Sequence, residues 1–522
     1  MVILKETPAV KRNLLDKAIE VIAPRMAVRR LQARAVLALA GGYTGAKIDR
    51  ASLGSWRPGG GSPTADIVDD LPLLRERSRD LARNTPVATG AIGTQVTHVV
   101  GTGLSMQPSI DADFLGLSES EADAWHVNTK REWKLWAESR DCDAARTLDF
   151  YGIQRQAFRG VLESGDCFVL TPNIPNRGRP LDLALQVIEA DRVMNPDHAR
   201  NTETLVEGIE FAETGEPRRY HVASTHPGEM RRVSKWDAYE AYGKNTGRRN
   251  VLHLFEQLRP GQPRGVPCLA PVIEPLKQLG RYTDAELNAA VVSGLWSVFI
   301  KMDPEAFQAL FDDDAKKTLL DQSKDWSGEM ESGKAVNLLP GESVEAPNPG
   351  RPNSEFDPFV TSILRQIGMA LEIPFEVLVM HYQSSYSAAR AAMLTAWRFF
   401  RARRDWLAGN LCQPVYELFL AEAVARGRIS APGFFADAAV RSAWCGAEWV
   451  GDGPGSLDPV KEVDAAEKRV KLGTSTLEAE SVLHDGVGWE GKHAQRAKEV
   501  RMRRAAGLDI EPTSERITTE PV

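Results

Sequence analysis

The chain has 522 residues, and at roughly 150 residues per domain this length predicts about three to four domains, or fewer if some are elongated. Hydrophobic residues make up 43% and charged residues 26%, a globular composition that excludes one small domain and wholesale disorder. Lys and Arg number 64 against 71 Asp and Glu, giving a net charge of -7. The molecule as a whole therefore does not attract nucleic acid or an anionic membrane, and any DNA contact must be local.

Three features of the sequence indicate a soluble protein in a reducing compartment. Lys5 and Glu6 interrupt the first apolar residues, whereas a secretory signal needs an apolar core of about 7–15. The longest uncharged apolar run, 287–300, is shorter than the roughly 20 residues of a membrane helix. The five cysteines are odd in number and contain no CxxC pair, which argues against a zinc site and a disulfide framework.

Residues 1–63 are expected to form a basic arm followed by a linker. Between Lys11 and Arg34, seven Lys and Arg residues alternate with apolar residues at helical spacing. This arm could contact nucleic acid, but the favoured interpretation is the solvated face of an ordinary or scaffold-docking helix. Residues 52–63 contain three consecutive glycines and two prolines, which predicts a linker or an extended arm.

Residues 64–270 carry signals for both helices and strands and are predicted to form an α+β body. Thr85 and Pro86 are typical of a helix start, and Gly101 of its end. Ser118 and Glu121 form a capping box ahead of a second helix. That helix places three tryptophans nearly on one face, which we interpret as core: Trp125, Trp133 and Trp136. Strands are predicted at Cys167–Leu170, Leu183–Ile188, Val206–Phe211 and Tyr220–Val222, the last two joined by a turn at 213–216.

From residue 271 onward the pattern is mainly helical. A long helix over 271–301 carries an apolar stripe that requires a partner helix: Val272, Leu276, Leu279, Thr283, Leu287, Ala290 and Gly294. The predicted order is this helix, a small α/β insertion at 302–353, a second helix at 354–380, a polar loop at 381–387 and a long helix at 388–426. Residues 427–522 alternate Gly/Pro turns with charged helices.

The sequence holds no complete catalytic, metal-binding or cofactor motif, so no catalytic residue, metal ligand or cofactor is predicted. Residues 328–334 have the frame of a phosphate loop, but Ala335 replaces the Ser or Thr that coordinates magnesium. Asp111 and Asp113 begin like a calcium loop that then lacks its remaining ligands. His221 and His226 have no third ligand nearby in the sequence, which favours structural roles.

A basic and aromatic cluster lies at residues 397–406 in the long helix. Its arginines are candidates either for ion pairs between subunits or for contact with DNA: Arg398, Arg401, Arg403 and Arg404. On a helix these side chains spread around the cylinder, so both interpretations stay open.

Several segments together resemble the lambda-type portal proteins of tailed bacteriophages, in consistent order over roughly residues 40–430. They are Arg77–Asn84, Gly90–Ile92, Val99–Gly103, Ile188–Arg192, Gly208–Phe211, Tyr220–Val222, Val251–Phe255, Arg259–Gly265 and Leu279–Tyr282. The resemblance implies an α+β, predominantly helical portal fold. Its parts would be a wing (64–270), a first stem helix (271–301), a clip (302–353), a second stem helix (354–380), a tunnel loop (381–387), a long helix (388–426) and a crown with tail (427–522).

The resemblance also implies a function and partners. The expected protein is a non-enzymatic ring, usually of twelve copies, at one capsid vertex, and it is the channel for DNA packaging and ejection. Expected partners are other copies of the chain, the terminase large subunit, a head-tail connector, the major capsid and scaffold proteins, and double-stranded DNA passing without sequence specificity. The protein would be made in the bacterial host cytoplasm and reside in the virion, without a membrane.

The predicted tunnel loop consists of His381, Tyr382, Gln383, Ser384, Ser385 and Tyr386. If every copy held a phosphate with one cation, the ring would grip DNA in a strongly salt-dependent way, so we expect acidic and neutral polar groups in the tunnel. A buried interhelical loop is the other interpretation. Two further functions remain alternatives, namely a capsid or adaptor subunit, and a metal-dependent nuclease using acids such as Asp312–Asp314.

Overall fold

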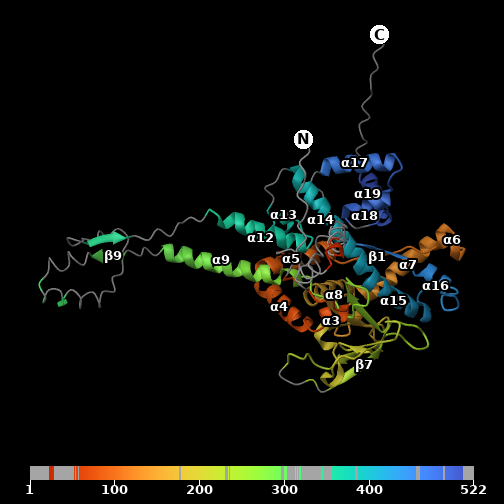
Figure 1. Cartoon of the computed structure of the whole chain (residues 1–522). Helices are drawn as coiled ribbons and strands as arrows, with labels where there is room; N and C mark the ends of the chain where they lie inside the picture. Colours follow the sequence, from red (N-terminus) through yellow and green to blue (C-terminus); the bar gives the residue numbers. More distant parts are fainter. Residues whose placement is uncertain are drawn as a thin grey trace, which may run out of the picture. The chain divides into compact units, whose positions relative to one another are not determined.

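The computed structural model describes residues 58–508, apart from gaps at 176–177, 230–232, 234, 295–298, 303–341 (where only 312, 314, 317 and 318 are described), 346–353, 382–385, 454–458 and 486–487. A few positions between 23 and 56 are also described. The chain divides into two compact units, Met1–Ser62 and Pro63–Val522. Figure 1 shows the helices and strands of the second unit. The predicted basic arm and the phosphate-loop frame lie almost wholly outside the described residues. Among the helices that are described, none has the length and hydropathy needed to cross a membrane.

The first part of the second unit is helical. Its helices are α3 (Pro63–Ile67), α4 (Leu71–Asn84), α5 (Pro86–Val99), α6 (Ala112–Leu115), α7 (Glu119–Ala137) and α8 (Phe150–Ser164), with a short 3-10 turn η2 (Arg140–Cys142). The predicted start of α5 at Pro86 is confirmed, and Gly101 follows its end with φ +58°. The capping box of α7 is confirmed as well, since Ser118 and Glu121 satisfy each other's backbone N–H groups.

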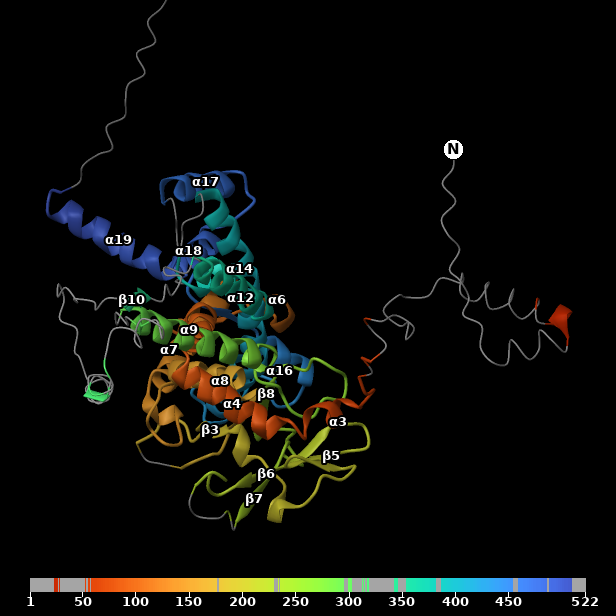
Figure 2. The same cartoon turned by 60° about the vertical axis from the view of Figure 1, so that its left-hand side comes forward.

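Two antiparallel sheets follow these helices (Figure 2). The first has the order β3-β2-β8, with β2 (Asp166–Leu170) between β3 (Gln186–Glu189) and β8 (Val251–Phe255). Every residue of β2 is buried, because α8 packs on this central strand. The second has the order β4-β5-β6-β7, formed by β4 (Leu205–Val206), β5 (Ile209–Phe211), β6 (Pro217–Ala223) and β7 (Trp236–Glu240).

The strand predictions are confirmed with two corrections. The run predicted at Leu183–Ile188 is a strand only from Gln186 onward, since Leu183 and Leu185 form isolated bridges. The turn at 213–216 joins β5 and β6 as predicted. The single run predicted at Val206–Phe211, however, is two strands, because Glu207 and Gly208 have φ of +48° and +80° and turn the chain between them. Short 3-10 turns complete this region: η3 (Ala190–Arg192), η4 (Pro196–His198) and η5 (Ala270–Val272).

The later part of the chain supplies α9 (Ile273–Gly294), α12 (Phe356–Ala370), α13 (Phe375–Leu378), α14 (Tyr386–Leu407) and α15 (Gln413–Ala425). A π-helical segment, η6 (Ala408–Cys412), joins α14 to α15, so the predicted long helix is helical throughout but locally widened. After it come α16 (Ala438–Trp444), β11 (Ala447–Val450), α17 (Pro459–Lys471), α18 (Leu477–Asp485) and α19 (Trp489–Ala505). Strand β11 pairs with β1 (Ser105–Pro108), and β9 (Phe299–Met302) pairs with β10 (Glu342–Glu345).

An aromatic cluster joins the two parts of the chain into one core. The ring of Trp133 on α7 lies 5.0 Å from Phe419 and 5.7 Å from Tyr416, both on α15, and 5.8 Å from Trp449 on β11. All three predicted core tryptophans are buried, Trp133 with only 2% exposure. Burial of each such ring contributes about 1.5–3 kcal/mol to the stability of the fold. This explains why residues far apart in the sequence pack against α7.

A close backbone approach requires glycine at two positions. Gly165 ends α8 with φ +89°, and Gly265 lies against it, so a Cβ on either residue would overlap the backbone of the other. Gly280 in the middle of α9, by contrast, has no atom within 4 Å of a Cβ added to it.

We predict that Gly265→Ala and Gly280→Ala change stability in opposite directions. Gly265→Ala should lower the free energy of unfolding by roughly 1–3 kcal/mol, because the backbone must move apart. Gly280→Ala should raise it by about 0.5–1 kcal/mol, because alanine favours a helix interior. Urea unfolding of both variants measures the effect, and a Gly265→Ala variant as stable as the wild type would contradict the close approach.

Candidate functional site

A buried ionic cluster lies where α4, β2 and the segment after β8 meet. The carboxylate of Asp166, the first residue of β2, accepts from Nη2 of Arg75 at 3.0 Å and from Nε of Arg264 at 2.5 Å. His253 on β8 lies with Nε2 3.2 Å from the same carboxylate. The side chains of Asp166 and Arg264 are fully buried. The cluster therefore cross-links three segments in the interior.

Arg264 extends this cross-link to two more segments. Its Nη2 donates to the carbonyl of Ala190, and its Nη1 donates to the carbonyls of Val193 and Glu207, at distances of 2.8–2.9 Å. The side-chain amide of Gln262 donates to the carbonyl of Arg264 and accepts from the backbone of Leu258 and Arg259, which shapes the loop. Three of the segments that carry the resemblance, 188–192, 251–255 and 259–265, thus meet at the Asp166–Arg264 ion pair.

The electrostatics of the cluster hold Asp166 charged and His253 neutral. Burial alone would raise the pKa of Asp166, but the Arg264 and Arg75 guanidinium groups outweigh it and lower the pKa far below its usual range. Burial lowers the pKa of His253 despite its contact with Asp166, and burial lowers the pKa of Arg75 to about 10. An ionised carboxylate saturated by donors neither exchanges a proton near neutral pH nor reaches solvent, so its role is structural.

Sequence reasoning missed this cluster. Asp166 and Arg75 carry no local signal, because charged residues are normally exposed and their partners here are 91 and 98 positions away. The only sequence signal is Arg264 between Pro263 and Gly265, a charged residue in a segment rich in turn formers.

The predicted stem helices meet along part of their length. Tyr282 on α9 stacks on Phe356 and contacts Phe359, both on α12, with ring centroids 5.5 and 4.9 Å apart. Leu276 and Leu279, nearer the start of α9, are buried. The sequence left open whether the partner of the stripe lies in the same chain or in another copy. Beyond Tyr282, Leu287 and Val291 are 64% and 56% exposed in the single chain.

The four arginines proposed at 397–406 occupy different environments. Arg398 and Arg401 are exposed, and Arg403 contacts Glu256 and lies over the ring of Phe399. Arg404 is buried and donates to the carbonyls of His98, Val99 and Asp452 at 2.9–3.0 Å. Arg404 thus satisfies carbonyl groups at the end of α5 and stabilises the fold of the subunit.

Of the predicted tunnel loop, the structure describes only the two ends. His381 is exposed, and its backbone N–H donates to the carbonyl of Glu376 at 3.1 Å. Residues 382–385 lie outside the described residues, and Tyr386 begins α14. Among the candidate nuclease acids, Asp312 and Asp314 are exposed and Asp313 is not described.

One group of metal-type ligands comes together in the described part of the chain. Atoms of Glu189, Asp191 and His226 lie within 4.8 Å of one another. The fold thus brings two carboxylates to His226, although the sequence offers no third ligand beside His221 and His226. Arg79, however, forms ion pairs with both carboxylates, so a guanidinium group already balances their charge. His221 instead contacts Glu210 at 2.6 Å. Asp111, from the failed calcium motif, caps α6 by accepting from the N–H of Phe114.

These features define a structural subunit, whose buried charges cross-link an α+β body and whose helix α9 leaves apolar side chains uncovered. The family model described as phage portal protein, lambda family, matches residues 49–404, and the chain belongs to this family. Two relatives are portal protein B of Escherichia phage lambda (27% identity, 87% of this chain and 88% of that one) and the portal protein of Escherichia phage N15 (28%, 88% and 89%).

The protein is therefore a structural virion component that forms the portal ring at the capsid vertex. This assignment takes the place of the alternative of a capsid or adaptor subunit.

Among solved structures, the chain is similar to a protein in the neck of a native gene transfer agent particle, computed with C12 symmetry. The TM-score is 0.42 and the identity 14%, covering 78% of this chain and 92% of that one. A chain from the neck of the empty particle gives a TM-score of 0.38 at 15% identity, covering 70% and 92%.

We predict that Asp166→Asn destabilises the unassembled protein by roughly 3–5 kcal/mol, because two buried guanidinium groups lose their counter-charge. Since the fold lowers the pKa of Asp166, its contribution is present at neutral pH and is lost as the pH falls below about 4. The free energy of unfolding of the variant should therefore fall less than that of the wild type as the pH drops below about 4. Denaturant unfolding from pH 7 to pH 3 measures both effects.

Glu163→Gln is the control, because Glu163 forms a partly exposed ion pair with Arg159 on α8 and its loss should change stability little. An Asp166→Asn variant with wild-type stability and acid sensitivity would show that the cluster does not hold the body together.

Proposed function

We propose that the ring is the channel through which double-stranded DNA enters and leaves the capsid, and that copies of the chain associate through the second half of α9. The observation that carries the ring contact is the pair Leu287 and Val291. They lie four residues apart on one face of the helix and are exposed in the single chain.

The composition of α9 suits contact with another helix. Ala289 and Ala290 are small, so a neighbouring backbone could approach closely between the larger side chains. Apolar surface of this kind is expected to be covered in the assembled protein, and each large side chain would contribute about 1.5–3 kcal/mol on burial. In a closed ring every copy forms the same contact. A small loss of binding free energy at one contact is therefore repeated at every contact of the ring.

We predict that the double variant Leu287→Asp and Val291→Asp abolishes or strongly weakens ring assembly while the subunit stays folded, because two carboxylates would be buried in the contact. Size-exclusion chromatography with light scattering gives the assembly state, and circular dichroism gives the fold. Val127→Asp on α7, which is 67% exposed, is the matched control and should assemble normally. Rings formed by the double variant would refute this contact.

We propose further that residues 381–387 line the narrowest part of the channel. Residues 381–386, which run from the α13–α14 loop into the first residue of α14, contain two tyrosines, two serines, a glutamine and a histidine, and no Lys, Arg, Asp or Glu. Uncharged polar groups can touch the phosphate backbone without releasing many counterions, so DNA can slide past them. The exposure of His381 is consistent with an accessible loop.

Deletion of residues 381–387, replaced by a short Gly/Ser linker, should leave ring assembly unchanged and impair DNA packaging or retention. Complementation of a phage that lacks its own portal gene, followed by measurement of DNA-filled particles, tests this. A Gly/Ser substitution of the same length in the exposed turn 213–216 is the control. Normal packaging by the loop deletion would overturn the assignment.

The remaining parts of the proposal rest on the family. We propose a ring of twelve copies that binds the terminase large subunit, a head-tail connector, and the capsid and scaffold proteins, after synthesis in the bacterial host cytoplasm. The domain division into wing, stem, clip and crown belongs to the same proposal. In it, α9 and α12 form the stem, and the paired strands β9 and β10 mark the base of the clip.

A further inference from the structure

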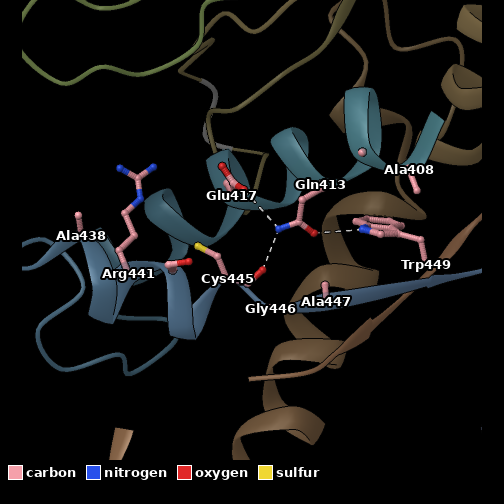
Figure 3. Close-up of a pocket in the computed structure, with 11 residues that line it drawn as sticks. Ala408, Gln413, Glu417, Ala438, Arg441, Cys445, Gly446, Ala447 and Trp449 are labelled. Carbon is pink, nitrogen blue, oxygen red and sulfur yellow. Dashed lines mark hydrogen bonds between the residues drawn. The ribbon is translucent and has the colours of Figure 1, made fainter. Parts of the chain in front are cut away.

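The body of the subunit is packed as far as β11, which lies beside the cavity drawn in Figure 3. Gln413 on α15 fixes this strand, since its Nε2 donates to the carbonyl of Cys445 at 2.8 Å and its Oε1 accepts from the indole N–H of Trp449 at 3.2 Å (Figure 3). Val450, the last residue of β11, is only 9% exposed. Beyond the strand the packing changes, because none of residues 460–508 whose exposure is described is buried.

Polar contacts hold the C-terminal helices α17, α18 and α19 to one another. Nε and Nη2 of Arg469 on α17 donate to the two carboxylate oxygens of Glu480 on α18, at 2.8 and 2.6 Å. Glu478 on α18 accepts from the backbone N–H of Trp489, the first residue of α19, at 2.5 Å. Large apolar side chains on or beside the helices are 50–77% exposed: Val460, Val463, Leu472, Leu477, Leu483, Met502 and Leu508.

Such helices need a partner surface. The three have 13, 9 and 17 residues, and helices of this length take most of their stability from packing an apolar face. No core within the single chain supplies this packing for the part of 460–508 that is described. The apolar side chains are therefore available to another molecule.

One face of α17 combines apolar side chains with an acid. Val463 and Asp464 follow Val460 by three and four residues, so the three side chains share a face of the helix. The two valines are 71% and 62% exposed, and Asp464 is exposed as well. Asp464 forms no ion pair with any residue that the structure describes. We call these three residues the α17 face.

One face of α19 has the same spacing and the opposite charge. Arg501 and Met502 follow Lys498 by three and four residues, and all three side chains are exposed. Neither Lys498 nor Arg501 forms an ion pair within the described part of the chain. Over its whole length α19 carries six Lys and Arg against two Glu. We call Lys498, Arg501 and Met502 the α19 face.

We propose that in the portal ring the α19 face of each copy packs against the α17 face of the neighbouring copy. Met502 would cover the two valines, and the cations would pair with Asp464. Both faces are exposed in the single chain, so the contact joins different copies. DNA phosphates would suit the cations of α19, but they offer nothing to Met502 or to the acidic α17 face. Two different, complementary surfaces on one chain are what a head-to-tail ring requires.

Chemical cross-linking tests the contact in assembled rings. A carbodiimide joins an amine to a carboxylate only where the two touch. Peptides linking Lys498 to Asp464 should occur in the band with the mass of two copies and be absent from the single-copy band. Lys498→Arg keeps the charge but removes the amine, so this peptide pair should disappear. Lys134→Arg, at an exposed position on α7, is the matched control and should leave the pair unchanged.

A charge exchange tests whether the contact stabilises the ring. Lys498→Asp and Asp464→Lys should each lower the NaCl concentration at which half of the rings dissociate by about twofold, because each variant brings like charges together. The two substitutions in one chain should restore the wild-type value. Lys134→Asp is the control and should have no effect. Light scattering after size-exclusion chromatography at increasing NaCl concentration gives the fraction of rings.

The inference rests on the portal ring but not on the proposed contact through α9, and the two can fail separately. A protein without rings in electron micrographs would remove the ring itself. Rings in which Lys498 is linked only within single copies, or not to Asp464, would overturn the contact between α17 and α19. Unchanged salt stability of both charge variants would overturn it as well, as would a combined variant no more stable than either alone.

Discussion

The fold depends on one buried carboxylate, that of Asp166, held between the guanidinium groups of Arg264 and Arg75. Through these two arginines a single charge fixes α4, β2, the turn η3 and the connection between β4 and β5. A buried ion pair of this kind adds less net stability than its Coulomb energy suggests, because desolvation opposes it. The ion pairs instead fix how these segments are positioned relative to one another, because any other arrangement would leave a buried charge without its partner.

This constraint also explains which parts of the structure could be predicted. Local signals were sufficient for the start of α5, the capping box of α7 and the β5–β6 hairpin, because each depends on residues within a few positions of one another. The ionic cluster and the β1–β11 pair join residues about 100 and 345 positions apart, and no local pattern encodes such contacts. The candidate site met the same limit. The basic and aromatic composition of 397–406 left Arg404 open between ion pairs and DNA contact, and it could not show that this side chain donates to carbonyls at the end of α5.

A single copy of the chain leaves part of its apolar surface exposed. The aromatic cluster around Trp133 buries the large rings of the body, whereas α9 continues beyond Tyr282 with Leu287 and Val291 exposed. Helix periodicity predicted the stripe correctly but could not say whether its partner lies in the same chain or in another copy. A partner in another copy fits a portal protein, because a ring needs the same surface to be available on every subunit.

The central claim is that identical copies close into a ring around an axial channel. Electron microscopy of the purified full-length protein measures this most directly, with native mass spectrometry giving the copy number. Closed rings with a central hole, wide enough for a DNA duplex, are the predicted result. Discrete single copies or open sheets under all assembly conditions would contradict the account.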